Sequence, residues 1–158
     1  MSRSRSTARP GEHANSDFLH HGHDKLLGTQ VRRAYITMRR SFATKVEPLG
    51  LTQTQCAALW LIDANPRISQ SDLAPLLMLD RVTMVDVIDK LHKRGFLKRE
   101  QSTADGRRWE LLLSKSGKST LAKAKKQILA IEREFSELFS EGELLVLLDR
   151  LKTVADNT

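Results

Sequence analysis

Apolar residues return every three or four positions from about Leu26, which is the spacing of one buried face of an α-helix. Pro48 and Gly50 interrupt this spacing and predict the end of the helix. The residues expected on the apolar face are Val31, Tyr35, Met38, Phe42, Val46 and Leu49. The first element is therefore predicted to be a long amphipathic helix.

Capping residues predict where the next three helices begin. Thr52 followed by Gln55 has the spacing of a capping box, and Ser69 followed by Asp72 repeats it before a short helix. Asp80 can cap the helix after that. The residues expected on the buried faces of these three helices are Ala58, Leu59, Ile62, Leu73, Leu77, Met84, Ile88 and Leu91.

The sequence period then changes from helical to strand-like. Gly95 is placed to end the preceding helix in the left-handed conformation. Residues 96–101 and 108–113 flank the loop STADG, in which Asp105-Gly106 is a turn signal. A β-hairpin is therefore predicted here.

Two further helices are predicted after the hairpin. Ser114 begins the first, and Ser140 with Glu143 forms a capping box before the second. Two short helices joined by a tight turn and followed by a hairpin form a winged helix-turn-helix. The expected fold class is mainly α with a small β-hairpin wing, and further helices lie before and after this motif.

Positive charge is concentrated in two parts of the chain, whose formal net charge is +7. Residues 24–47 carry six basic against two acidic side chains, and residues 80–108 carry eight against five. This asymmetry favours an acidic partner such as nucleic acid.

The second helix of the helix-turn-helix, residues 80–94, is expected to enter the major groove of double-stranded DNA. Valine side chains on its outward face can touch a thymine methyl group, and Asp86 can accept from a cytosine amine. Asp89 is expected to pair with a neighbouring arginine instead. The residues predicted to bind DNA are Ser69, Gln70, Arg81, Val82, Thr83, Asp86, Lys90, Lys93, Arg107 and Arg108.

Two adjacent arginines, Arg107 and Arg108, follow the tip of the predicted hairpin. A basic hairpin tip beside a groove-reading helix can reach the flanking minor groove, whose negative potential attracts arginine. We therefore expect Arg107 in the minor groove and Arg108 on a phosphate. Asp105 would orient an arginine or close the turn.

Between Leu49 and Gly117 the chain resembles the MarR family of bacterial transcription regulators. The resemblance rests on LGLTQTQCAALWLI, ISQSDLAPLLMLDRVTMVDVIDKLHKRGFLKRE and STADGRRWELLLSKSG, the last containing the wing pattern Asp-x-Arg-Arg. It implies a homodimeric repressor on a palindromic operator, with the first and last two helices as the dimer base. It also implies that Arg107 contacts the minor groove and that a small effector binds between base and DNA-binding lobe.

Two residues depart from the family pattern. Pro75 lies inside the short helix, where it removes a backbone donor and can kink the helix. Ser114 stands where the family usually has threonine, and serine caps a helix equally well.

The predicted organisation has three parts. A flexible arm covers residues 1–24, a helical dimerisation region covers 25–48 and 115–158, and the winged helix-turn-helix covers 49–114. Most of the histidines lie in the arm, which leaves metal binding as an alternative to a solvated tail that touches DNA phosphates. These histidines are His13, His20, His21 and His23.

The first helix offers the clearest indication of an effector. Arg32 and Arg39 are seven residues apart and nearly superposed beside the apolar stripe, and Arg33 and Arg40 form a second such pair. Paired guanidinium groups beside aromatic residues suit a ligand with an aromatic body and anionic groups. Family resemblance points to an aromatic carboxylate or its coenzyme A thioester. The predicted ligand-binding residues are Arg32, Tyr35, Met38, Arg39, Phe42 and Trp60. The alternative is a dimer core with solvated arginines.

The sequence leaves two alternatives to this class of protein. A redox sensor would use Cys56, although a buried core thiol is the favoured interpretation of that residue. A winged-helix module could instead bind protein or RNA. No catalytic triad, metal-spaced cluster or Gly-rich phosphate loop appears, and His92 has no evident partner, so neither an enzyme nor a cofactor is expected.

Cellular location is predicted from absences in the sequence. No apolar run approaches the roughly eighteen residues of a membrane span, and the N-terminal arginines precede no apolar segment of a secretory signal. A single cysteine fits a reducing compartment. A cytoplasmic protein with no membrane partner is therefore expected.

Overall fold

The computed structural model describes residues 22–103 and 108–157. The chain divides into two compact units, Met1–Thr37 and Met38–Thr158. The predicted arm up to residue 21 and the tip of the wing, residues 104–107, lie outside the described residues. The expectations for the arm, for Asp105 and for Arg107 therefore remain predictions.

The first unit contains a 3₁₀ turn, η1 (His23–Lys25), and the beginning of helix α1 (Leu27–Lys45). In this part of α1 the apolar side chains of Val31 and Tyr35 are exposed. The end of α1 lies in the second unit, where Phe42 is buried. The long amphipathic helix is confirmed, but its apolar stripe is covered only toward its end.

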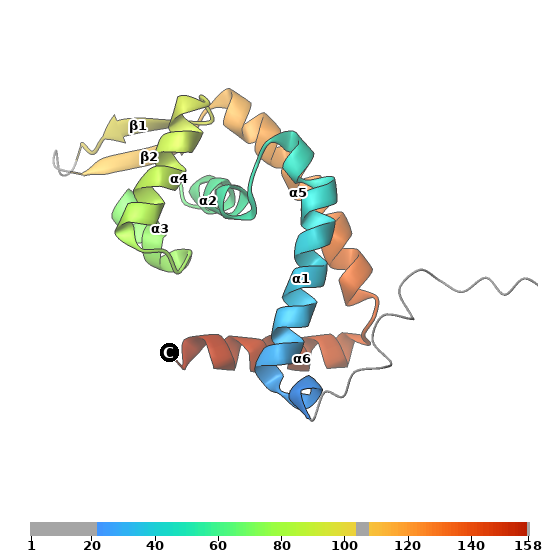
Figure 1. Cartoon of the computed structure of the whole chain (residues 1–158). Coiled ribbons are helices and arrows are strands. Elements are labelled where there is room, and N and C mark those ends of the chain that lie inside the picture. The colour runs from blue at the N-terminus through green and yellow to red at the C-terminus, as the bar shows by residue number, and fades with distance from the viewer. Residues whose placement is uncertain (1–21, 104–107, 158) are drawn as a thin grey trace, which may run out of the picture. The chain divides into compact units, whose positions relative to one another are not determined.

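The second unit contains the remaining elements (Figure 1). They follow one another in the predicted order of helix, short helix, helix, hairpin, long helix and helix. The elements are η2 (Glu47–Leu49), α2 (Gln53–Ala64), α3 (Gln70–Leu76), α4 (Arg81–Lys93), β1 (Leu97–Gln101), β2 (Trp109–Leu113), α5 (Lys115–Ser136) and α6 (Glu141–Asp156). The fold is mainly α with a small β-hairpin wing, as predicted.

The predicted caps are present at the helix starts. Thr52 and Ser140 form complete capping boxes with the third helical residues of α2 and α6. The side chains of Ser69 and Asp80 accept backbone N–H groups in the first turns of α3 and α4. These bonds satisfy backbone donors that have no partner within a helix, so they fix where each helix begins.

Two backbone features end α3 and α4. Pro75 lies one residue before the end of α3, so it falls in the last turn and does not break the middle of the helix. Gly95 follows α4 with φ of 70°, the left-handed conformation predicted for it.

One hydrophobic core holds the helix-turn-helix and the wing together. The strands pair antiparallel, with Leu97 opposite Leu113 and Gln101 opposite Trp109. Leu97 and Leu111 of the hairpin are buried in the same cluster as the inner faces of the helices. The fully buried large side chains include Leu51, Leu59, Ile62, Leu73, Met84, Ile88, Leu91 and Leu121. Burying them removes apolar surface from water, which is the main force that assembles the unit.

Helix α6 contributes no buried residue to its unit. Its exposed apolar side chains are Leu145, Val146, Leu147, Leu148, Leu151 and Val154. Across the described residues, no helix is long and apolar enough to cross a membrane.

Candidate nucleic-acid interface and ligand cavity

The buried face of α4 determines which residues the helix turns outward. Met84, Ile88 and Leu91 are buried as predicted, and Val87 is buried beside them. Because an α-helix advances about 100° per residue, Val82 and Asp86 then lie on the opposite side. Val82 is 80% exposed.

Polar side chains on the outward part of α4 already have partners within the chain. The Thr83 hydroxyl donates to the Asp80 carboxylate over 2.6 Å, and Lys90 pairs with Asp86 over 2.6 Å. The Thr83 hydrogen bonds lower the pKa of Asp80, so its carboxylate remains charged as a cap.

Asp89 on α4 is paired with Arg99 of β1. The prediction that Asp89 binds an arginine is therefore confirmed. This pair joins α4 to the wing, and it removes an acidic group that would repel DNA phosphates.

Arg67 connects the α2–α3 turn to both strands of the wing. Glu100 and Glu110 stand directly opposite each other in the hairpin, where like charges destabilise a strand pair. The Arg67 guanidinium lies 2.7 Å from Glu110 and 3.3 Å from Glu100 and compensates both charges. Hydrogen bonds from Ser102 and Arg67 hold the pKa of Glu110 below its usual range.

Arg108 connects the base of the wing to the start of α3. Its guanidinium donates to the Ser69 hydroxyl over 2.9 Å and to the Asp72 carboxylate over 2.5 Å. Ser69 is only 5% exposed, and its hydroxyl also donates to Asp72. The hydrogen bond from Ser69, together with the charge of Arg108, lowers the pKa of Asp72. In the free protein the side chains of Arg108 and Ser69 therefore contact the start of α3. That Arg108 binds a phosphate and that Ser69 binds DNA remain predictions.

The other predicted DNA-binding residues differ in how far their side chains are exposed to solvent. Arg81 and Lys93 are exposed at the two ends of α4, and Gln70 is half-buried at the start of α3. The structure thus brings α4, the start of α3 and the wing into one unit with a shared core. Such an arrangement can present α4 to a major groove and the wing to the flanking groove.

A cavity of about 200 Å³ lies among α1, α2 and α5. Three predicted ligand-binding residues, Met38, Phe42 and Trp60, line it together. An engineered apolar cavity of about 150 Å³ admits benzene, so this one has room for a single aromatic ring. The lining residues that sequence reasoning did not find are Gln53, Cys56, Ala57, Ile128, Ile131 and Glu132.

The polar groups of this cavity are few. Gln53 and Glu132 are exposed, whereas Phe42 and Ile131 are buried. Lys125 lies over the Trp60 ring, 4.7 Å from its centre, in a cation–π contact that holds the ring in place. The cavity therefore combines an apolar interior with a carboxylate and an amide near solvent.

Cys56 belongs to the wall of the cavity and is 2% exposed. Burial raises the pKa of its thiol to about 11. The thiol is therefore protonated near neutral pH, which confirms the prediction of a buried core cysteine and opposes a reactive thiolate.

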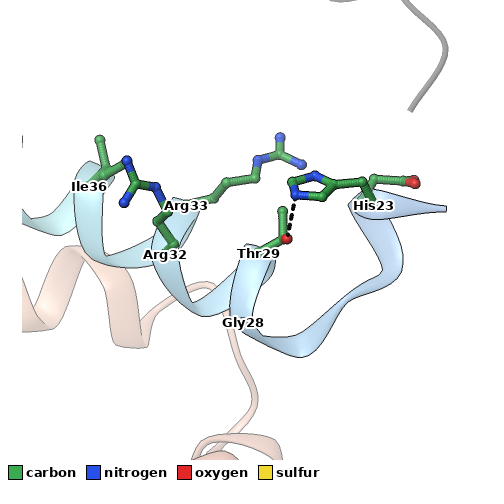
Figure 2. Close-up of a pocket in the computed structure, with 7 residues that line it drawn as sticks. His23, Gly28, Thr29, Arg32, Arg33 and Ile36 are labelled. Atoms are coloured by element: carbon green, nitrogen blue, oxygen red, sulfur yellow. Dashed lines mark hydrogen bonds between the residues drawn. The ribbon is translucent and has the colours of Figure 1, made fainter. Parts of the chain in front are cut away.

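A second cavity, of about 450 Å³, lies along the start of α1 in the first unit. Figure 2 shows the Arg33 side chain extending toward the His23 ring, which hydrogen-bonds the Thr29 hydroxyl over 3.4 Å. Arg32 lines this cavity and not the one that contains Met38. Tyr35 and Arg39 line neither cavity, so the structure does not gather the six predicted ligand residues around one space.

Among residues 22–103 and 108–157, no group of three side chains could hold a metal ion. His92 has a structural partner, since its Nδ1 lies 3.1 Å from the Leu97 carbonyl oxygen and joins the end of α4 to β1.

The fold and its outward α4 helix define the class of winged helix-turn-helix DNA-binding proteins. Comparisons with known proteins narrow this class. The sequence profile of the MarR family matches residues 51–109. A putative transcriptional regulatory protein for the hcr operon of Thauera aromatica is 32% identical over 146 residues, covering 90% of this chain and 88% of the relative. The chain therefore belongs to the MarR family of DNA-binding transcription regulators.

Solved structures agree with this assignment. The transcriptional repressor CouR, bound to a 23-mer DNA duplex, is 34% identical with a TM-score of 0.82, covering 89% of this chain and 99% of CouR. CouR has also been solved bound to p-coumaroyl-CoA, with 33% identity and a TM-score of 0.78 over 87% of this chain and 96% of CouR. PcaV from Streptomyces coelicolor, with its natural ligand, is 26% identical with a TM-score of 0.78, covering 90% and 98% of the two chains.

Proposed function

We propose that this protein is a homodimeric repressor that binds a palindromic operator and is released by the coenzyme A thioester of an aromatic acid. The observation that carries the proposal is the likeness to CouR, which extends over nearly the whole of both chains. The relative is a repressor seen with both a DNA duplex and an aromatic acyl-CoA. Cytoplasmic location and absence of catalysis belong to the same proposal.

Exposed apolar surface supports the homodimer. Helix α6 carries a stripe of leucines that its own unit leaves exposed, and in the first unit the apolar side chains of Val31 and Tyr35 are also exposed. A second copy of the chain can cover such a surface and remove it from water, which favours a symmetric dimer. We assign residues 25–48 and 115–158 to dimerisation and residues 49–114 to DNA binding.

The carboxylate of the cavity in the second unit supports a thioester over a free acid. Glu132 is the charged group among its lining residues, and a second carboxylate beside it would be repelled. A thioester carbonyl is neutral, so the aromatic acyl group can enter without that repulsion. The coenzyme A phosphates would then bind exposed arginines of α1, among which Arg39 follows directly on the cavity residue Met38.

Binding to DNA should be tested on the region upstream of the protein's own gene. We expect tight binding in fluorescence anisotropy that weakens steeply with salt, because phosphate contacts release counterions. Arg107→Ala should cost about 1–3 kcal/mol of binding free energy, since this arginine is proposed to enter the minor groove. Salt-insensitive complex formation, or preference for a protein or RNA partner, would favour an interaction module and contradict the proposal.

Release from DNA should be tested with aromatic acids and their coenzyme A thioesters at fixed salt. A thioester is expected to release the operator where its free acid does not. Arg39→Ala should raise the thioester concentration needed by about tenfold, the effect of losing one charge-assisted hydrogen bond, and leave DNA affinity unchanged. Arg150→Ala, which removes an exposed arginine from α6, is the matched control. Loss of DNA binding with intact thioester binding would show that Arg39 serves the operator.

A redox sensor is the second candidate, and the structure opposes it. Cys56 is buried and its thiol has a raised pKa, so peroxide should leave operator binding unchanged. Release of DNA by peroxide in the wild type but not in Cys56→Ser would revive that candidate.

A further inference from the structure

An apolar side chain stands at the centre of the outward face of α4. Val82 lies in the first turn of the helix, opposite the buried face, and four-fifths of its surface is exposed. Val85, one turn further along, is 39% exposed beside it. A β-branched residue has only a modest preference for helix, and exposing it to water gains nothing. The two valines thus present methyl groups on the face that α4 turns outward.

Several polar side chains around Val82 already have partners within the chain. Thr83 donates its hydroxyl to Asp80, and Asp86 is paired with Lys90. Asp89, in the following turn, is paired with Arg99. A base that these groups read would compete with the internal contact that each of them makes. The methyl groups of the valines have no such cost.

We propose that Val82, with Val85 beside it, recognises the 5-methyl groups of thymine in the operator. This inference rests on the proposed function, because it assumes that α4 enters the major groove. There the thymine methyl is the one apolar group that a base pair presents, and apolar side chains contact it. The first residues of a recognition helix are those that reach base edges. Each half-site should therefore contain an A·T pair beneath the first turn of α4.

The test removes only the methyl groups from the DNA. The upstream fragment is amplified with dUTP in place of dTTP, which preserves base pairing and backbone but deletes every thymine 5-methyl group. Affinities for the two fragments are then measured by anisotropy with the wild type, Val82→Ala and Val146→Ala. Val146, an exposed valine of α6, provides the matched control.

The wild type should bind the uracil fragment several-fold more weakly, about fourfold for each buried methyl group that is lost. Val146→Ala should show the same ratio between fragments. Val82→Ala should bind the thymine fragment more weakly and show a smaller ratio than the wild type, because only the contact of Val85 with a methyl group remains. Circular dichroism should show that Val82→Ala keeps its helix content, because alanine favours helix more than valine does.

The outcomes separate the inference from the proposed function. An equal loss on uracil DNA for wild type and Val82→Ala would mean that the methyl groups act through DNA shape, and would overturn the role of Val82. Equal wild-type affinity for both fragments would overturn it as well. If the wild type binds neither fragment, the proposed function is wrong, and the inference that rests on it is wrong too.

Discussion

Leu151→Glu is expected to convert the dimer into a monomer and to abolish tight operator binding. Leu151 belongs to the α6 stripe formed with Leu144, Leu147 and Leu148, which recur at helical spacing. In a dimer this side chain would be covered by the partner. A glutamate there would bury a charge without a counter-ion. The free energy lost by burying that charge exceeds the free energy that dimerisation gains.

The expected loss of DNA affinity follows from the number of half-sites bound together. In a dimer the binding of one lobe raises the local concentration of the other, and such linkage typically contributes about 10²–10⁴-fold in affinity. A monomer of Leu151→Glu keeps its α4 and wing, so it should retain weak, salt-sensitive binding. Light scattering coupled to size exclusion gives the mass, and anisotropy gives the affinity.

Val146→Glu is the control for this change. Val146 belongs to the same helix and is 59% exposed, but it lies on the side of α6 away from the leucine stripe. Its glutamate should stay in water and leave both mass and affinity unchanged. A dimeric Leu151→Glu protein would contradict the assignment of α6 to the dimer interface.

The helices and the wing could be predicted from the sequence because their signals are local. A cap and the groups it satisfies lie within three residues of each other, as at Thr52 and Ser140. The left-handed residue after α4 is a glycine, whose conformational freedom marks it in the sequence. The strand pairing follows from the alternation of residues around one turn signal.

Contacts between distant residues could not be predicted in the same way. Nothing near Arg67 in the sequence indicates that it will compensate two glutamates more than thirty residues away in the wing. Ser69 could be recognised as a cap, but its burial beneath Arg108 depends on where the hairpin packs. Both contacts form only once the core has folded, and no local sequence pattern specifies how the core packs.

The ligand cavity shows the same limit. Its walls from α1 and α2 were predicted through Met38, Phe42 and Trp60, which are apolar or aromatic residues on amphipathic helices. The wall from α5, which includes Ile131 and Glu132, could not be predicted. The sequence does not tell which side of this long helix faces α1 and α2. Glu132 matters most for the proposed function, in which its charge is the reason to expect a neutral thioester and not a free acid.

Gly117→Ala is expected to destabilise the junction between the wing and α5. A Cβ atom at this position would lie 1.9 Å from the carbonyl oxygen of Phe96 and 2.9 Å from its carbonyl carbon. Both atoms belong to the backbone, so no side-chain rotation relieves the clash. The same carbonyl accepts the Ser114 N–H over 3.0 Å, and Ser114 in turn caps α5 through the Gly117 N–H. The added methyl group therefore pushes apart the strand connection and the helix start together.

The expected loss is about 1–3 kcal/mol in the free energy of unfolding, the usual cost of forcing an extra carbon into a packed site. Thermal unfolding followed by circular dichroism should show a melting temperature lower by about 2–4 °C for each kcal/mol. Gly142→Ala in α6 is the control, because a Cβ there meets nothing within 4 Å. Alanine at that helical position should stabilise by about 0.4–1 kcal/mol. Equal melting temperatures for the two variants would show that α5 does not pack on Phe96 as described.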